Sequence, residues 1–175
     1  MSASDHDKPD APELDVWICD FTDAEDRAAF VRLMTEFAAE PTSGLPHLGA
    51  EHFEAVAVDL ENRAGTLVLL AAREESEITE GVLVAFEGYT TFGKGQLFNV
   101  HDLHVSPSAR GVGVGSEMME TLADIAKNHG FAKITLEVAA TNSDAVRLYR
   151  KLGYHGLDTA KEVAAGTTYF AHKRM

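Results

Sequence analysis

Three glycines stand at alternate positions directly behind an arginine in the stretch ARGVGVG, residues 109–115. Arg110 offers a cation, and Gly111, Gly113 and Gly115 leave the main-chain N–H groups around them open to close approach. Where such a turn opens a helix, the unpaired N–H groups and the positive end of the helix dipole bind phosphate. The turn therefore predicts diphosphate binding. The alternative is a tight strand-to-helix turn that needs glycine only for its backbone dihedral angles.

Two common phosphate-binding motifs do not fit this turn. A dinucleotide fingerprint, G-x-G-x-x-G, that begins at Gly111 would need glycine where the chain has Ser116. A Walker loop, G-x-x-x-x-G-K-[ST], occurs nowhere in the sequence. The string R-x-x-G-x-G does fit, with Arg110, Gly113 and Gly115 at its fixed positions. A nucleotide-binding oxidoreductase and a P-loop nucleotidase are therefore excluded on motif grounds.

Polar side chains that could move protons precede the turn in NVHDLHV, residues 99–105. Unless a bulge intervenes, strand alternation predicts one face with Asn99, His101, Leu103 and Val105 and another with Asp102 and His104. With His101 and His104 on opposite faces, an H-x-x-H metal site is not expected here. An imidazole has a reference pKa near about 6.5, which suits His101 to act as a base, directly or through water. The alternative for His101 is a hydrogen-bonded structural histidine.

A second pattern follows the turn. The string N-x-x-A-x-x-L-Y-x-x-x-G-[FY] is matched by Asn142, Ala145, Leu148, Tyr149, Gly153 and Tyr154. Together with the R-x-x-G-x-G turn at this spacing, it makes the segment from Leu103 to Tyr154 closely resemble the GNAT superfamily of acyl-CoA-dependent N-acyltransferases. The resemblance implies the GNAT fold, acetyl-CoA as cosubstrate and direct transfer to an amine in a ternary complex.

The same resemblance implies which residues bind coenzyme A, mainly through main-chain groups. It places Leu103, His104 and Val105 along the pantetheine arm, and Arg110, Gly111, Val112, Gly113, Val114, Gly115 and Ser116 at the pyrophosphate. Asn142 would contact the cofactor arm or order the loop beneath it, and an ordinary helix N-cap is the alternative and compatible role. His104 is otherwise interpreted as a structural residue.

Two catalytic roles follow from the resemblance. Tyr149 matches the general acid that protonates the departing thiolate, and a phenol pKa near about 10 lies close to that of a thiol. The alternative is an aromatic core residue. Related enzymes carry Glu or His at the positions of Asn99 and His101, and polyamine acetyltransferases carry a similar acidic pair, which makes His101 the candidate base. Asp102 would orient a histidine or attract a cationic acceptor.

The acceptor side is expected between the first two helices, the loop PTSGLPHLG and the turn GYTTFGKG. Phe37, Tyr89 and Phe92, with Asn99, are the candidate acceptor-binding residues, although aromatic residues at such places are more often part of the core.

The elements that must position these residues follow from hydrophobic periodicity and turn signals. Strands are predicted over 14–20, 66–72, 81–89, 96–105, 133–139 and 167–173, and helices after Thr22 or Asp23, over 52–62, over 114–128 and from a cap at Asn142 or Ser143 to Gly153. The order β-α-α-β-β-β-α-β-α-β predicts a mixed sheet of the α/β class (α+β), antiparallel in its first half and with a β-α-β crossover in its second. Residues 1–13 are expected to be a disordered polar lead and 14–175 a single domain.

Composition limits the partners. The chain has 175 residues, 45% of them hydrophobic and 25% charged, which is typical of a globular domain. A formal net charge of −13 argues against nucleic acid and anionic membrane as partners and is compatible with a cationic substrate. The lone cysteine, Cys19, excludes an intrachain disulfide and a Cys-rich metal cluster, so no metal is expected. With no secretory signal and no long apolar run, a cytoplasmic location is expected.

The sequence thus predicts an N-acetyltransferase that transfers an acetyl group from acetyl-CoA to a primary amine of a small molecule. A polyamine or a related cationic compound is the first expectation for the acceptor. A protein N-terminus or lysine is the alternative, and a non-catalytic acyl-CoA-binding regulatory module on the same fold is the rival. Dimerisation is common in the superfamily, so a homodimer is an open expectation.

Overall fold

A computed structural model of the chain describes residues 13–41, 48–157 and 166–175. Six strands form one sheet: β1 (Leu14–Ile18), β2 (Thr66–Arg73), β3 (Gly81–Thr90), β4 (Gly95–Val105), β5 (Lys133–Ala139) and β6 (Thr168–Arg174). Four helices accompany them: α1 (Ala24–Ala38), α2 (Ala50–Glu61), α3 (Val114–Asn128) and α4 (Ser143–Lys151). The predicted order of elements is confirmed. The structure adds a short 3₁₀ turn, Pro107–Ala109, just before the glycines.

The strands lie in the sheet in the order in which they follow along the chain. All neighbouring pairs are antiparallel except β4 and β5, which run parallel and are joined through α3. This arrangement confirms the predicted mixed sheet with an antiparallel first half and a β-α-β crossover. The glycine turn belongs to this crossover and lies between the end of β4 and the start of α3.

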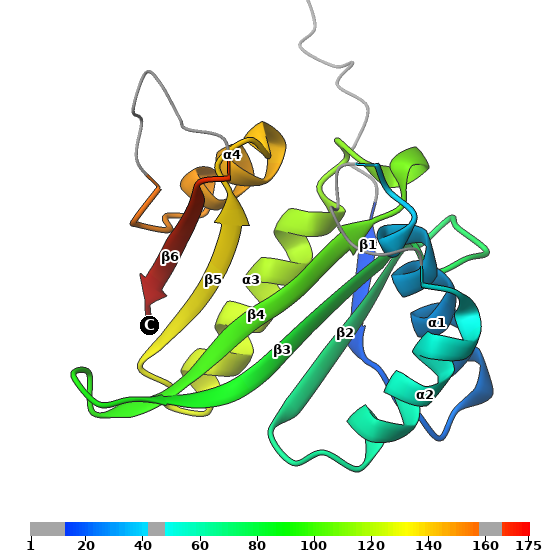
Figure 1. Ribbon diagram of the computed structural model, residues 1–175, viewed down its shortest axis with the longest axis horizontal. Coiled ribbons are helices and arrows are strands. Elements are labelled where there is room, and N and C mark those ends of the chain that lie inside the picture. The colour runs from blue at the N-terminus through cyan, green and yellow to red at the C-terminus, as the bar shows by residue number, and fades with distance from the viewer. Residues whose placement is uncertain (1–12, 42–47, 158–165) are drawn as a thin grey trace, which may run out of the picture.

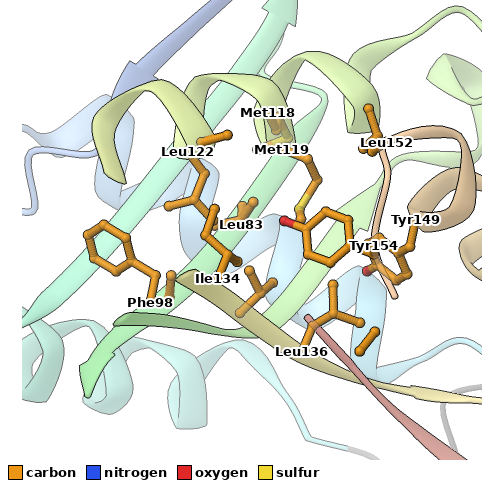
Figure 2. Close-up of a cluster of buried hydrophobic side chains, with 14 of the residues drawn as sticks. Leu83, Phe98, Met118, Met119, Leu122, Ile134, Leu136, Tyr149, Leu152 and Tyr154 are labelled. Carbon is orange, nitrogen blue, oxygen red and sulfur yellow. The ribbon is translucent and has the colours of Figure 1, made fainter. Parts of the chain in front are cut away.

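Helices cover both faces of the sheet, so its central strands are buried on both sides (Figure 1). Alternate residues of β2 illustrate this arrangement: Leu69 and Ala71 belong to the core under α3, whereas Val68 and Leu70 belong to the core under α1 and α2. The core under α3 also takes in Tyr149 of α4, together with the residues labelled in Figure 2. The two faces therefore carry separate cores, and a functional side chain on the sheet belongs to one face or the other.

Local signals fix the helix starts. Asp23 caps α1, because its side chain accepts hydrogen bonds from the N–H groups of Glu25 and Asp26. Asn142 caps α4 by accepting from the N–H of Ala145 at 3.1 Å. The helix-capping role considered for Asn142 is thus observed.

Two sequence expectations fall mostly outside the described residues. Residues 1–12 contain nearly all of the expected polar lead, and residues 42–47 contain most of the loop PTSGLPHLG. Residues 158–165, between α4 and β6, are likewise outside. Within the described chain, no helix has the length and hydropathy needed to span a bilayer.

Candidate active site

Strand β4 carries a β-bulge at His101. On the neighbouring strand β3, Val84 pairs with Asp102, and the next residue, Ala85, pairs with Val100, which leaves His101 as the extra residue. A bulge changes which face of the sheet the later side chains occupy. The sequence prediction of alternating faces held only if no bulge intervened. A bulge does occur, so the side chains of residues 99–105 do not alternate regularly between the two faces.

The bulge places His101 and Asp102 on the same side of the sheet. Both line a cavity under α1 and α2, whereas Leu103 and Val105 pack against the core under α3. The expectation that His101 shares a face with Leu103 and Val105 is therefore wrong. Two neighbouring residues of one strand now present an imidazole and a carboxylate together.

The parallel strands β4 and β5 are paired over only part of their length. Leu97–Val100 pair with Lys133–Leu136, and the later residues of β4, 101–105, have no partner on β5 (Figure 1). Main-chain groups at the facing edges of the two strands are therefore not paired with each other beyond the bulge. Hydrophobic patterning predicts that strands exist and gives no sign of where their pairing stops, so the sequence did not predict this divergence.

The glycine turn has the conformation that an anion-binding helix start needs. Gly111 has φ +83° and Gly113 has φ +109°, in the left-handed region that favours glycine. Gly113 is the N-cap of the 15-residue helix α3 and offers no side chain to its first turn. The N–H of Ser116 donates to the carbonyl of Gly113 at 2.9 Å, so that N–H is used within the helix. The earlier N–H groups of the helix start, at Val114 and Gly115, are those that lack an intrahelical partner.

Gly115 serves a different purpose from the other two glycines. Its φ is ordinary, and a Cβ there would lie 3.5 Å from Leu148 Cδ2 and 3.7 Å from Val105 Cγ2. The first turn of α3 therefore lies between the end of β4 and helix α4. Val112, also placed in this turn by the resemblance, is exposed, whereas the Val114 side chain is buried.

The guanidinium of Arg110 is directed toward α1. Its Nε donates to the carbonyl of Val105 at 2.9 Å, and its Nη2 is paired with Glu40 Oε1 just after the end of α1. Arg110 therefore joins the end of β4 to α1. The guanidinium of Arg110 is thus engaged by a carboxylate, whereas Gly113 leaves the main-chain N–H groups at the start of α3 without a side-chain cap.

Tyr149 lies on the buried face of α4, one residue after the Leu148 that contacts the turn. Only 6% of Tyr149 is exposed, and burial raises its pKa to about 12. The phenol therefore keeps its proton at neutral pH and is a hydrogen-bond donor. Its pKa is farther from that of a thiol than the sequence alone predicted.

A second tyrosine lies against Tyr149. The Tyr154 ring centroid is 5.7 Å from that of Tyr149, and both rings belong to the cluster drawn in Figure 2. The Tyr154 hydroxyl is buried and makes no hydrogen bond to any described residue. Burial raises its pKa as well. Sequence analysis identified Tyr154 only as a position of the motif, and the structure places its ring beside that of Tyr149.

The imidazole and the carboxylate on β4 are close enough to interact. His101 Nδ1 lies 3.4 Å from Asp102 Oδ2, with side-chain exposures of 63% and 24%. Burial raises the pKa of the Asp102 carboxyl, and His101 partly opposes that rise. The His101 ring meets the ring of Phe86 edge to face, with centroids 5.5 Å apart. His101 is accessible to a ligand, and Asp102 supports it from a more buried position.

His104 is a buried residue on the same side of the sheet as His101, stacked on Phe37 with ring centroids 5.2 Å apart. Its Nδ1 lies 3.4 Å from Glu40 Oε1 and its Nε2 lies 3.7 Å from Glu36 Oε1. Burial lowers the pKa of His104 more than these carboxylates raise it. The expectation that His101 and His104 face opposite sides is wrong, because the bulge lies between them. No group of three or more metal-ligating side chains occurs in the described part of the chain.

The cavity under α1 and α2 has a volume of about 260 Å³. Its lining comprises Phe30, Met34, Phe37, Leu48, Phe53, Val56, Leu60, Val84, Phe86, His101 and Asp102. Of the acceptor-binding candidates, only Phe37 is among them. Tyr89 and Phe92 are exposed near the tip of the projecting β3–β4 hairpin (Figure 1), and the Asn99 side chain donates to Thr135 Oγ1 on β5 at 3.0 Å. Sequence reasoning missed Phe86, whose polar neighbours on β3 hide its contact with α2.

A larger hollow, of about 450 Å³, lies along β6. It is lined by Gly153, His155, His172, Lys173 and Arg174. None of these residues belongs to the glycine turn or to β4. The cavity under α1 and α2 is shared by His101 and Asp102, whereas Tyr149 belongs to the core under α3, on the other face of the sheet.

Several curated proteins with similar sequences are named as acetyltransferases. Streptothricin acetyltransferase of Streptomyces lavendulae is 34% identical over 83 residues, which are 46% of this chain and 44% of that protein. Thialysine N-epsilon-acetyltransferase of Bos taurus is 34% identical over 73 residues, 42% of each chain. The chain therefore spans less than half the length of these two relatives.

Solved structures show the same fold over most of the chain. A chain of the NatC complex bound to Gag peptide and CoA superposes with a TM-score of 0.69 at 17% identity, over 93% of this chain and 99% of that one. The sequence model of the Acetyltransferase (GNAT) family matches residues 30–154, which contain the bulge, the glycine turn and Tyr149. The protein belongs to the GNAT acetyltransferase family.

Proposed function

We propose that this protein is an enzyme that transfers an acetyl group from acetyl-CoA to a primary amine of a small molecule. The observation that carries the proposal is the position of Tyr149. It is a buried phenol on α4, and its neighbour Leu148 lies against Gly115 at the start of α3. A buried proton donor thus lies on the helix that packs against an uncapped helix start, and such a start fits an anionic cosubstrate.

The described residues fit coenzyme A in two places. Gly113 leaves the N-terminal N–H groups of α3 open to the pyrophosphate. The unpaired edge of β4 beyond Val100 offers main-chain donors and acceptors to an extended pantetheine arm. In this arrangement Leu103 and Val105 would lie beside the arm, and a main-chain N–H of β4 would polarise the thioester carbonyl.

The transfer forms one bond and breaks another. The ammonium form of the acceptor must first lose a proton, and His101, at the exposed end of the Asp102 pair, takes it directly or through water. The neutral amine then attacks the carbonyl carbon, the C–N bond forms and the C–S bond breaks. The Tyr149 hydroxyl stabilises the departing sulfur by donating to it. The amine gives up two protons in all, of which one ends on the thiol and one reaches solvent.

Sequence relatives favour a small-molecule acceptor. The two curated relatives compared above are named for acetyl transfer to streptothricin and to thialysine. Two alternative hypotheses are tested beside the small-molecule acceptor: transfer to a protein N-terminus or lysine, and acyl-CoA binding without catalysis. A binding module has no need for a buried phenol on α4 or for an imidazole on β4.

The decisive experiment measures thiol release from acetyl-CoA in the presence of a panel of small amines and N-terminal peptides, with acetyl-CoA affinity measured separately by calorimetry. We expect acetyl-CoA to bind, and thiol to appear only when a small amine is present, with the N-acetyl product confirmed by mass. Tight binding without thiol release from any acceptor would establish the binding-module alternative. Release with peptides alone would establish the protein acceptor.

A further inference from the structure

The cavity that His101 and Asp102 share is apolar almost throughout. Nine of its lining side chains are aliphatic, aromatic or thioether groups, and four of these are the phenylalanines at positions 30, 37, 53 and 86. They come from α1, from α2 and the residues just before it, and from β3, so the lining is built by three separate parts of the chain. Such a lining favours a ligand with a large apolar part, because the apolar side chains supply affinity and the few polar groups fix the orientation of the ligand.

The polar and apolar parts of the lining differ in depth. Phe30 is fully buried, and only 5% of Phe53 is exposed. The His101 side chain, by contrast, is 63% exposed. The polar end of a ligand would therefore lie near the exposed His101, and its apolar part would contact the more deeply buried phenylalanines. An amine at the end of an apolar body has this polarity.

Charge limits the acceptor to one cation. Asp102 is the single carboxylate among the described lining residues. A positive charge lies close to the lining, because the guanidinium carbon of Arg63 is 4.3 Å from the centre of the Phe86 ring. A second ammonium group inside the cavity would lose its hydration without gaining a carboxylate, which is costly. A linear polyamine or a polycationic antibiotic therefore does not fit this lining.

The volume of the cavity also favours a small acceptor. The cavity encloses about 260 Å³, the space of roughly nine waters at about 30 Å³ each in the liquid. This space suits one ring or one short alkyl chain. A molecule of several sugar rings would extend beyond it into solvent.

We propose that the acceptor is a primary monoamine with an apolar body, an arylalkylamine or alkylamine whose nitrogen meets His101 and Asp102 and whose body fills the cavity under α1 and α2. This proposal rests on the proposed acetyl transfer. It also replaces the polyamine that the net charge suggested, because the overall charge attracts any cation whereas the lining selects among them.

The test compares acceptors that differ only by a second cation. Hexylamine and 1,6-diaminohexane have the same chain length, and 2-phenylethylamine and spermidine extend the comparison to a ring and to a longer polycation. We expect kcat/KM for hexylamine and for 2-phenylethylamine to exceed that for 1,6-diaminohexane by at least about tenfold, which corresponds to about 1.4 kcal/mol. Equal or faster turnover of the diamine or of spermidine would overturn the proposal.

Three matched variants test whether the lining causes the selection. Leu60→Glu adds a carboxylate to the cavity, and Leu60→Gln adds the same bulk without the charge. Val58→Glu adds the charge to an exposed position of α2 outside the lining. We expect only Leu60→Glu to lower the preference for the monoamine, by about tenfold. An equal change with Val58→Glu would show that general charge, and not the cavity, decides.

Binding separates failure of this proposal from failure of the proposed function. Calorimetry in the presence of coenzyme A measures hexylamine and 1,6-diaminohexane without any turnover. If hexylamine binds at least about tenfold more tightly than the diamine, the cavity proposal stands even where no thiol is released, and acetyl transfer is then the part that fails. If hexylamine does not bind, or the diamine binds equally well, the cavity proposal fails whatever the enzyme acetylates.

Discussion

His101 Nδ1 lies 3.4 Å from Asp102 Oδ2, although the two residues are neighbours on one strand and a regular strand would direct their side chains to opposite faces. The β-bulge at His101 brings the pair together on the side of the sheet that α1 and α2 cover. The exposed imidazole and the more buried carboxylate form one polar unit at the edge of an apolar cavity. We propose that this unit removes the proton from the acceptor amine.

Asp102 is predicted to cost stability while it supports activity. Burial raises the pKa of its folded carboxyl above the unfolded value, so the ionised form is disfavoured in the folded protein. This cost is absent below the unfolded pKa, near about 3.9, and is fully present once the pH has risen above the folded pKa. We therefore expect Asp102→Asn to raise the free energy of unfolding at pH 7 and to lower kcat/KM by about 10-fold to 100-fold, as loss of a supporting group does.

Denaturant titrations of the wild type and Asp102→Asn at pH 7 and near pH 3 measure this effect. The stabilisation should be largest at pH 7 and shrink toward pH 3, where both the folded and the unfolded carboxyl are protonated. An Asp102→Asn variant that is less stable at pH 7 would show that the pairing with His101 outweighs the burial of the charge.

Tyr149 and Tyr154 give a matched pair of hydroxyl deletions within one cluster. We expect Tyr149→Phe to lower kcat by about 10²-fold to 10⁴-fold, the usual contribution of a positioned general acid. Tyr154→Phe removes a buried hydroxyl that has no partner among the described residues, so it should leave activity unchanged and keep or slightly raise stability. Steady-state kinetics and thermal unfolding of both variants decide the matter. Equal losses of rate would show that the cluster packing matters and not the Tyr149 proton.

Release of Arg110 from Glu40 is predicted to strengthen acetyl-CoA binding. The guanidinium is now paired with the Glu40 carboxylate, and Glu40→Gln would leave it available to the pyrophosphate as a charge-assisted donor. We expect up to about a tenfold tighter Kd at low salt, with the gain shrinking as salt rises. Calorimetry measures it, and the double variant Glu40→Gln with Arg110→Ala serves as the control. A gain that persists in the double variant would exclude Arg110 as its cause.

His104 is predicted to make stability depend on pH. Burial lowers the pKa of folded His104 below the unfolded value of about 6.5, so the unfolded chain binds the proton more readily. Its contribution is therefore fully present above pH 6.5 and is lost as the pH falls from there toward the lowered folded pKa. We expect the unfolding free energy of His104→Phe, which keeps a ring against Phe37, to fall less than that of the wild type between pH 7.5 and pH 5. Parallel curves for the two proteins would contradict this.

Much of the fold could be predicted from local patterns. The bounds of α3 and β5 follow from helical and strand periodicity and from Gly130, and the structure reproduces the predicted 114–128 and 133–139. The caps at Asp23 and Asn142 are local hydrogen bonds that the sequence places within a residue. Short-range effects of this kind depend on a few neighbouring residues, so the chain itself reveals them.

The acceptor side could not be predicted in the same way. Tyr89 and Phe92 have the right residue type but lie on the projecting hairpin, and Phe86, three residues before Tyr89, lines the cavity. The choice among them depends on the register of β3 with its neighbours and on where α2 packs. Both are contacts between distant segments.

The sequence by itself determined the order of the elements, the glycine turn at the start of α3 and the family motif that contains Tyr149. Each of these depends on residue types at short fixed spacings. Only the tertiary structure decided how the site is built. The bulge at His101, the limited pairing of β4 with β5, the engagement of Arg110 by Glu40 and the apolar lining under α1 and α2 all arise from packing between segments far apart in the chain. The physical reason is that strand register and burial minimise the energy of the whole sheet with its two cores, which no local stretch specifies.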